Sequence, residues 1–275
     1  MDEGTLRQLQ LAQLEIAKEI KRVCDANQID YFMDSGTLLG AVRHQGFIPW
    51  DDDMDIGMLR TDYERFISIA PESLKEGFFL QTWDTDPSFP FCYAKVLKEG
   101  TEYIEATSAG TEKRNEIFVD VFAYDSLETE KAEESSLKRM QRYRRILMMK
   151  SGIKPWKGNA SKVYNFVKRV AYLYYRFIGV FCSREKLKDL YYQERTKYNH
   201  SNNTRFYYNG NTSEYLPMTF PKAVLESLCE LPFEGVFMKA PRDYQTYLSL
   251  AYGDYMRLPP EEQREGHHKI ISLKL

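Results

Sequence analysis

The residues best suited to chemistry lie in the stretch 50–57, where the sequence reads W-D-D-D-M-D-I-G, with four carboxylates in five positions. Such carboxylates repel one another unless a cation lies among them. Side chains of an extended strand alternate between its two faces, so Asp51, Asp53 and Asp55 are predicted to share one face. Hard oxygen ligands on a rigid strand suit magnesium and phosphoryl chemistry. We expect Asp53 and Asp55 as metal ligands and Asp51 as a further ligand.

Two other features complete the expected site. Gly36 and Thr37 form a turn of small residues between a predicted strand and a predicted helix, where backbone N–H groups can approach a phosphate closely. Asp120 lies among apolar residues of another predicted strand, where a carboxylate is costly without a partner. A metal held by the paired aspartates supplies that partner if the two strands are neighbours. Each feature alone is common, but their order is typical of the nucleotidyltransferase superfamily.

Four nearby residues have two interpretations each. Asp52 points away from the predicted ligands and is expected as a turn or capping residue, with a ligand as the alternative. Arg43 and His44 either reach phosphate or are solvated on their helix. Lys95 lies in a predicted apolar strand, where an unpaired ammonium is expensive, so we expect a phosphate or the acidic cluster as its partner.

The stretch from Ser35 to Ile56, S-G-T-L-L-G-A-V-R-H-Q-G-F-I-P-W-D-D-D-M-D-I, resembles the signature of the LicD family of phosphocholine transferases. The fukutin-related proteins are similar to this family. Further segments of the chain also match, at 93–96, 118–125, 232–235, 252–260 and 267–268.

The resemblance implies an enzyme with a nucleotidyltransferase fold and a magnesium cofactor, with manganese as the alternative. It would transfer phosphocholine from CDP-choline to a sugar hydroxyl of a cell-surface glycan such as teichoic acid. Another CDP-activated alcohol (ribitol, glycerol or ethanolamine) is the alternative cargo, and the acceptor is either lipid-linked or free. Asp53 and Asp55 would be metal ligands, and Asp120 would be a third ligand or the general base. The residues expected to contact the donor are Gly36, Thr37, Arg43, Lys95 and His267.

Two other functions remain open on the residues alone. A nucleotidyltransferase acting on a small substrate would use the same carboxylates. A membrane-associated scaffold would use them only to bind a divalent cation, but it leaves the glycine turn and Asp120 without a reason.

Strands interleaved with helices predict an α/β or α+β core. With the resemblance, we expect the α+β class, with a nucleotidyltransferase-like mixed sheet flanked by helices in a catalytic core at 1–134. Helical periodicity predicts a helix over 5–26 and another over 38–43, and the pattern Thr61-x-x-Glu64 predicts a capping box at the start of a third. The expected strands are 30–33, 53–58, 78–82, 93–97 and 117–122.

The segment 135–185 has a different character. It contains no acidic residue from 135 to 184 but 13 Lys or Arg, so the rest of the chain carries 25 basic and 40 acidic residues. Aromatic residues are mixed with the basic ones over 163–182. Such a helix either lies at a lipid interface, through 138–184, or packs its aromatics on the core and shows its basic face to water.

Residues 186–275 are expected to be mainly helical and to complete the site, with turns at Phe220-Pro221, Leu231-Pro232 and Ala240-Pro241.

Composition excludes several classes of protein. A net charge of −2 gives no argument for nucleic-acid binding, and the four scattered cysteines fit neither a zinc site nor a disulfide scaffold. The sequence shows neither a secretory signal nor an apolar stretch of transmembrane length. We therefore expect a cytoplasmic protein, with the inner face of the membrane as the alternative location.

Overall fold

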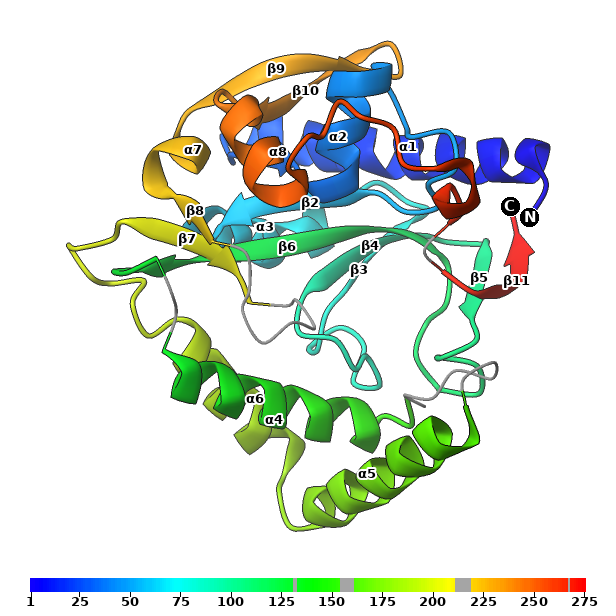
Figure 1. Cartoon of the computed structure of the whole chain (residues 1–275), viewed down its shortest axis with the longest axis vertical. Helices are drawn as coiled ribbons and strands as arrows, with labels where there is room; N and C mark the ends of the chain where they lie inside the picture. The colour runs from blue at the N-terminus through cyan, green and yellow to red at the C-terminus, as the bar shows by residue number, and fades with distance from the viewer. Residues whose placement is uncertain (131–132, 154–160, 211–218, 267) are drawn as a thin grey trace.

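The computed structural model describes residues 1–130, 133–153, 161–210, 219–266 and 268–275 (Figure 1). Its helices are α1 (Glu3–Ala26), α2 (Ser35–His44), α3 (Arg60–Ser73), α4 (Glu134–Lys150), α5 (Lys162–Val180), α6 (Arg184–Arg195), α7 (Lys222–Glu226) and α8 (Tyr244–Tyr252). Its strands are β1 (Phe32–Met33), β2 (Asp55–Leu59), β3 (Phe78–Gln81), β4 (Ala94–Lys98), β5 (Glu102–Glu105), β6 (Ile117–Leu127), β7 (Phe206–Asn209), β8 (Thr219–Pro221), β9 (Leu228–Phe233), β10 (Val236–Pro241) and β11 (Ile270–Lys274). Within these ranges no helix is both long and apolar enough to cross a bilayer.

A mixed sheet in the order β1-β2-β6-β4-β3 lies at the centre of the fold. Strand β2 runs parallel to β6, and the other pairings of this sheet are antiparallel. The long strand β6 pairs with β4 through its first half and with β7 through its second half. The expected α+β class with a mixed sheet is confirmed, whereas the likeness to nucleotidyltransferases remains a prediction.

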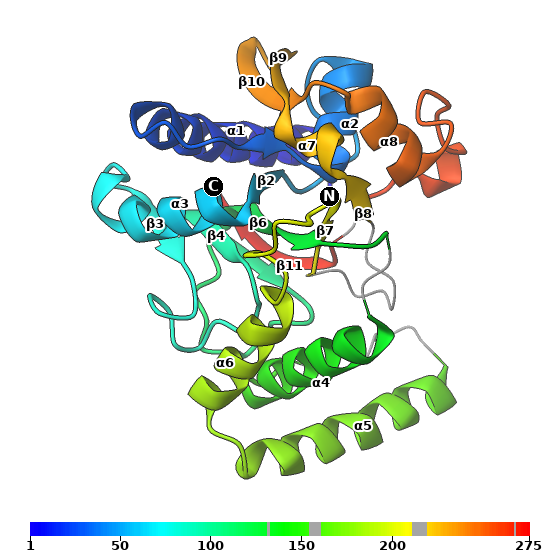
Figure 2. The same cartoon turned by 90° about the vertical axis from the view of Figure 1, so that its left-hand side faces the viewer.

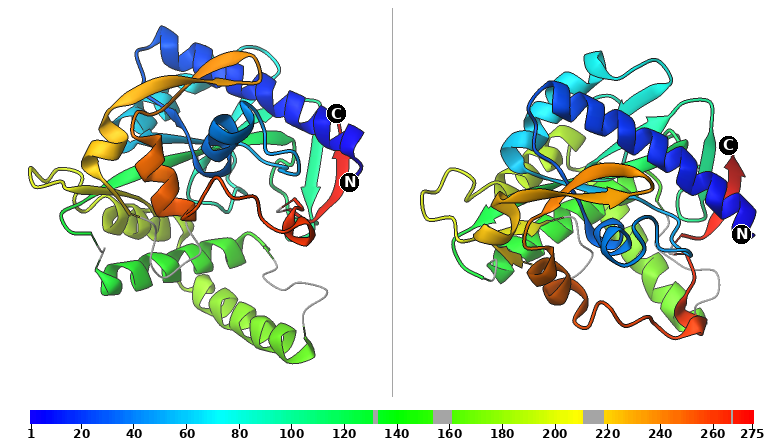
Figure 3. Two further views of the ribbon diagram at one scale, coloured as in Figure 1. Left: turned by 45° about the horizontal axis from the view of Figure 1, so that its top comes forward. Right: turned by 90° about the horizontal axis from the view of Figure 1, so that it is seen from above.

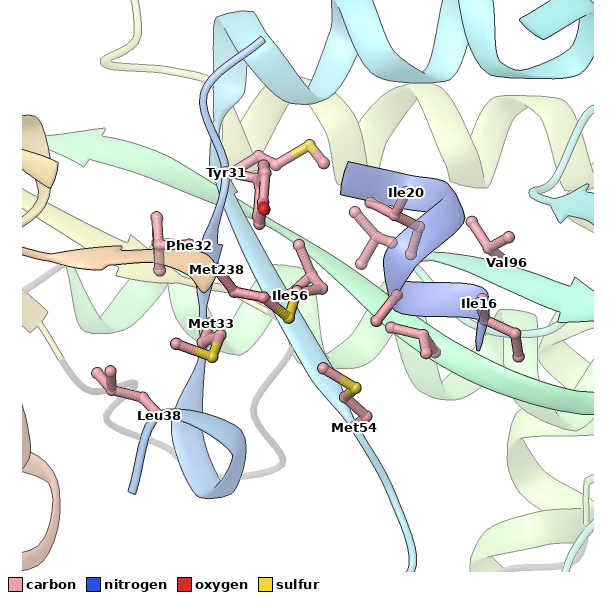
Figure 4. Close-up of a cluster of buried hydrophobic side chains, with 14 of the residues drawn as sticks. Ile16, Ile20, Tyr31, Phe32, Met33, Leu38, Met54, Ile56, Val96 and Met238 are labelled. Atoms are coloured by element: carbon pink, nitrogen blue, oxygen red, sulfur yellow. The ribbon is translucent and has the colours of Figure 1, made fainter. Parts of the chain in front are cut away.

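Helix α1 forms because its apolar residues recur at helical spacing and because the Asp2 carboxylate accepts the Thr5 N–H at 2.9 Å. Its fully buried residues Ile16 and Ile20 pack over the sheet, opposite Met54 and Ile56 (Figure 4). Helices α4, α5 and α6 form a layer on the other side of the sheet from α1 (Figures 1 and 2). The sheet thus lies between α1 and the layer formed by α4, α5 and α6.

Two small antiparallel sheets flank the central one. Strands β9 and β10 form a hairpin whose two turn residues, Glu234 and Gly235, have φ angles of 50° and 76°. A two-residue hairpin with both φ values positive matches the right-handed twist of its strands. The other small sheet pairs β11, near the end of the chain, with β5 (Figure 3).

The prediction of a mainly helical part at 186–275 is wrong, because β7 to β11 lie there beside α6, α7 and α8. The prolines suggested turns, but Pro221, Pro232 and Pro241 lie within strands of the structure. Proline has no N–H to donate, and a strand with an unpaired edge tolerates it. The helical prediction for 135–185 is confirmed by α4 and α5 within the described residues.

The capping box predicted at Thr61 is also wrong. Helix α3 begins one residue earlier, at Arg60, after Leu59 as its N-cap, and no side chain caps it. The Arg60 side chain instead turns to a buried carboxylate on β6.

That carboxylate is Asp125, which is fully buried and forms the centre of what we call the Asp125 cluster. Both of its oxygens receive hydrogen bonds at 2.7 Å from the Arg60 guanidinium, and it also accepts bonds from Arg195 and Asn199. Burial alone would raise the pKa of Asp125, but the two guanidinium groups hold it below its usual value. Arg195 also donates to the Ala123 carbonyl at 2.6 Å. The cluster therefore joins α3 and α6 to β6.

We predict that Arg195→Ala lowers the free energy of unfolding by about 3–5 kcal/mol, because it leaves part of a buried charge without its partner. Urea denaturation at pH 7 measures this loss. Arg139→Ala is the matched control: this half-exposed arginine of α4 pairs with Glu194 of α6, and such pairs contribute about 0–1 kcal/mol. Equal losses in the two variants would contradict a special role for the Asp125 cluster.

Candidate active site

The parallel register of β2 and β6 brings two predicted site residues together. Asp55 at the start of β2 lies directly beside Asp120 on β6. The Asp120 N–H also donates to the Met54 carbonyl at 3.0 Å, which fixes the register at this end. The two strands that carry the aspartates are therefore neighbours, as the predicted metal site requires.

The residues before β2 do not continue the strand. Residues 51–54 have no regular structure, so the predicted alternation of faces over Asp51, Asp53 and Asp55 does not apply. The loop nevertheless brings Asp51 and Asp53 close enough to share a hydrogen bond. We call Asp51, Asp53, Asp55 and Asp120 the acidic cluster.

Gly36 and Thr37 lie in the first turn of α2 rather than in a turn before it. A Cβ atom on Gly36 would lie 2.9 Å from Asp51 Oδ2, so glycine lets the carboxylate approach the start of the helix. The Thr37 hydroxyl accepts the Asp55 N–H at 2.8 Å and thereby fixes the start of β2. Ser35, just before them, has a φ of 48°, the left-handed conformation that turns the chain from β1 into α2.

Lys95 on β4 is buried opposite Asp120, and its Nζ lies 2.8 Å from Asp120 Oδ1. The ammonium also lies over the face of the Phe118 ring. Of the two expected partners of Lys95, the structure thus provides the acidic cluster. Lys95 offsets part of the cost of burying Asp120.

The acidic cluster remains short of positive charge. Burial, and then the charges of Asp53 and Asp120, raise the pKa of Asp55 well above its usual value. Burial and the neighbouring Asp53 raise the pKa of Asp51 to about 8. Burial also raises the pKa of Asp120, although Lys95 opposes this. These carboxylates oppose one another's ionisation, and every ligand atom that they offer is an oxygen. The acidic cluster therefore suits a hard divalent cation.

Asp52 contacts the segment near the end of the chain. It is buried, and its carboxylate accepts the backbone N–H of His268 at 3.1 Å and lies 3.1 Å from the ring Nδ1. Burial lowers the pKa of His268, but the hydrogen bond to Asp52 and the charge of Asp53 raise it overall to about 9. Asp52, Asp53 and His268 present ligand atoms within 4.8 Å of one another. His267, which we predicted to contact the donor, lies outside the described residues.

A buried hydrogen-bond network lies beneath the start of α2 and was not predicted. Asp34, the N-cap of α2, is fully buried and accepts bonds from Tyr124 on β6, at 2.7 Å, and from Tyr247 on α8. The Tyr247 ring stacks on Phe220, with centroids 4.2 Å apart. Asp34 carried one sequence signal, since aspartate directly before S-G-T is a typical N-cap. The network links α8 to the strands that hold the acidic cluster.

A cavity of about 690 Å³ opens beside the acidic cluster, between α2 and the segment 252–264. We call it the arginine-lined cavity, because Arg43, Arg257 and Arg264 line it together with Gly36 and Asp51. The wall also contains aromatic rings, those of Trp50, Tyr252 and Tyr255. The Arg264 guanidinium lies over the Trp50 ring, 5.5 Å from its centroid. Cationic and aromatic groups thus meet within reach of the carboxylates.

Arg43 reaches this cavity from the last turn of α2, where its Nη1 donates to the Tyr255 carbonyl at 3.1 Å. Burial and the nearby Arg264 lower the pKa of Arg43, although Tyr252 opposes them. Gly36, Arg43 and Asp51 thus all line this cavity. Lys95 does not line it, and lies instead on β4, where it is paired with Asp120 of β6. Sequence reasoning did not name Arg264 or Tyr252 as site residues, although Tyr252 begins the matching segment 252–260, and both lie about 200 residues from the acidic stretch.

Comparison with known proteins gives a consistent result. Residues 28–157 match the family model described as LicD/FKTN/FKRP, nucleotidyltransferase domain. The chain is 30% identical over 276 aligned residues to the lipopolysaccharide cholinephosphotransferase LicD of Haemophilus influenzae, covering 98% of this chain and 97% of that protein. It is 42% identical over 48 residues to the human ribitol 5-phosphate transferase FKRP, which is 18% of this chain and 10% of that protein. An uncharacterized Rickettsia typhi protein is 44% identical over 68 residues, 25% of this chain and 22% of that protein.

The crowded carboxylates predict a characteristic pH dependence. The raised pKa values of Asp51 and Asp55 mean that the folded protein binds protons that the unfolded chain releases above about pH 4. The stability of the metal-free protein should therefore fall as the pH rises from 5 to 8, by up to about 1.4 kcal/mol per pH unit for each such proton. The raised pKa of His268 acts in the same direction, because its stabilising charge is lost as the pH rises toward 9.

Urea unfolding with EDTA at pH 5, 6.5 and 8 measures this slope. Asp51→Asn should flatten it, while Asp84→Asn, at a side chain that is 90% exposed, should leave it unchanged. Saturating magnesium should raise the stability most at pH 8, where the carboxylates are most fully ionised. If the dependence of stability on pH is unchanged in Asp51→Asn, the charge repulsion that we infer within the acidic cluster is contradicted.

Proposed function

This chain belongs to the LicD family of phosphotransferases, and from that premise we propose that it transfers phosphocholine from CDP-choline to a hydroxyl of a cell-surface glycan. The observation that carries the proposal is the acidic cluster beside the arginine-lined cavity, whose wall includes Asp51 of that cluster. A CDP-alcohol is an anionic diphosphate joined to an aromatic base. It needs cationic groups, a ring surface and a divalent cation, and residues suited to all three lie together here.

Asp53, Asp55 and Asp120 are the proposed metal ligands, with Asp51 as a further ligand. Magnesium is the proposed ion and manganese the alternative, and either would neutralise charge on the departing CMP. Thr37 keeps Asp55 in place through its backbone N–H. Gly36 leaves room for Asp51 and for a donor phosphate at the start of α2.

The transfer itself requires one bond to form and one to break. The acceptor hydroxyl oxygen attacks the phosphorus that carries the alcohol, the bond from that phosphorus to CMP breaks, and CMP leaves with the electron pair. Asp120 either takes the hydroxyl proton or holds the metal. Lys95 keeps the Asp120 carboxylate paired in both cases.

The arginine-lined cavity is the proposed site of the donor. Arg43 and Arg264 would pair with the diphosphate, since guanidinium groups match phosphate geometry. The aromatic walls at Trp50 and Tyr252 would contact the cytosine ring or the quaternary ammonium of choline. His268, held beside the cluster by Asp52, would also contact the donor, the role that we predicted for its neighbour His267.

The alternative cargo is another CDP-activated alcohol. The similarity to a ribitol 5-phosphate transferase supports ribitol as the second candidate. The acceptor in our proposal is teichoic acid or lipopolysaccharide, and the relative from Haemophilus influenzae, named for lipopolysaccharide, supports the latter. The reaction would take place at the inner face of the membrane, on a lipid-linked acceptor.

We predict that Asp53→Asn and Asp55→Asn each lower CMP release from the donor by at least about 100-fold, because the amide removes a metal-binding charge. The assay incubates purified protein with magnesium, a glycan acceptor and CDP-choline, CDP-ribitol, CDP-glycerol or CDP-ethanolamine in turn. Circular dichroism verifies the fold of each variant, and Asp84→Asn is the exposed control. Failure of the wild-type protein with every donor, or normal turnover by either variant, would refute the assignment.

Arg264→Gln and Arg43→Gln should act on donor binding rather than on chemistry. A charge-assisted hydrogen bond contributes about 1.5–3 kcal/mol, so we expect KM for the donor to rise about 10- to 100-fold with a smaller change in kcat. Arg65→Gln, at an arginine that is half exposed on α3, is the control. If KM stays constant in both variants while kcat falls, the donor does not bind in this cavity.

A further inference from the structure

The outer face of α5 has no part in the proposed reaction, yet it is strongly apolar. Six residues at alternating spacings of three and four, each more than half exposed, form what we call the apolar stripe: Val163, Phe166, Val170, Leu173, Phe177 and Val180. Val167, Tyr174 and Phe181 are also exposed and widen the stripe along one side. A soluble protein seldom exposes so large a continuous apolar surface without a partner for it.

The opposite face of α5 is already occupied. It packs on α4, where Lys150 Nζ donates to the Gly179 carbonyl at 2.5 Å and to the Cys182 carbonyl at 3.1 Å. A Cβ on Gly179 would lie 3.0 Å from Lys150 Cγ, so glycine allows this close packing. The alternative in which the aromatics of this segment pack on the core is therefore wrong for Phe166, Tyr174 and Phe177. The helix thus packs on α4 with one face and exposes the apolar stripe on the other. It lies at the edge of the molecule (Figures 1 and 2).

A row of positive charge follows the apolar stripe. Lys162, Arg169 and Arg176 recur every seven residues, so they lie along one flank of the helix. All three are exposed. No acidic residue occurs from 135 to 184, so neither α5 nor its neighbour α4 beyond its first residue supplies a negative charge.

We propose that α5 docks the protein on an anionic lipid bilayer. The helix lies parallel to the membrane plane, with the apolar stripe at the boundary of headgroups and acyl chains and the basic row against lipid phosphates. A helix with a wide aromatic and aliphatic face and Lys/Arg beside it is suited to this position. The length of α5, 19 residues, corresponds to about 28 Å of helix lying along the surface.

The charges beside the apolar stripe favour a bilayer, rather than a second copy of this chain, as the partner of α5. The three-four spacing of the stripe would also suit a helix pair, in which residues flanking the seam meet across the interface. Here the flanking charges are all basic, so pairing two α5 helices would bring like charges together with no acidic partner on the helix. An anionic bilayer supplies the missing negative charge as well as an apolar interior.

Sedimentation with lipid vesicles tests the proposal on the full chain. We expect binding to vesicles with 30% phosphatidylglycerol, little binding to pure phosphatidylcholine, and a steep loss of binding between 50 and 300 mM salt. Lys162→Glu with Arg169→Glu and Arg176→Glu should weaken the partition coefficient by at least about 100-fold, since each basic group at the surface contributes about fivefold. Leu173→Asp with Phe177→Asp should weaken it by at least about tenfold.

Two controls separate docking from general effects. Lys18→Glu with Lys75→Glu and Lys274→Glu changes the net charge equally at exposed positions elsewhere, and Phe237→Asp removes an exposed apolar side chain on β10. Neither should change vesicle binding much, and no variant should change CMP release in the absence of lipid. The substituted positions are exposed, so circular dichroism should show an unchanged fold.

Three results would overturn the proposal. One is equal binding to neutral and anionic vesicles, and another is the absence of binding at low salt. The third is a dimer seen by analytical ultracentrifugation that Leu173→Asp dissociates, which would assign the apolar stripe to a second copy. The docking surface does not depend on the identity of the donor, so it stands or falls independently of the proposed reaction.

Discussion

The parallel pairing of β2 with β6 is the constraint on which the rest of the site depends. Its register places Asp55 beside Asp120 in a poorly solvated part of the sheet, where two negative charges are costly. Several neighbouring features make this arrangement tolerable. Lys95 supplies a counter-charge to Asp120, Thr37 fixes the backbone of Asp55, and Gly36 allows the loop with Asp51 to approach. The pairing of these strands thus concentrates negative charge that only a cation can fully balance.

Sequence reasoning succeeded where a single residue contradicted its surroundings. A lone carboxylate or ammonium in an apolar strand implies a nearby partner, and Asp120 and Lys95 proved to be partners of each other. It failed where contacts join distant segments, because no local pattern encodes that Asp52 holds His268 or that Tyr247 bonds Asp34. It also failed where local signals have two meanings.

Proline and aspartate both show this ambiguity. Pro232 suggested a turn but lies within β9, since a strand with a free edge does not need every N–H. The run of aspartates suggested an extended strand, whereas the strand begins only at Asp55. The α+β class and the helices of the basic segment could be predicted from periodicity and composition. The long-range pairing of β5 with β11 could not, because the two strands are separated by most of the chain.

The separation of charge along the chain has a consequence for the whole molecule. Of the 13 basic residues of 135–184, the eleven within the described residues lie in α4, α5 and α6, while the rest of the chain has 25 basic and 40 acidic residues. Such a molecule is a large electric dipole, and a charged surface exerts a torque on a dipole before any contact is made. At physiological ionic strength this torque acts within roughly one Debye length, about 8 Å. The protein would then arrive with its basic end already turned toward a negative surface, so orientation would precede binding.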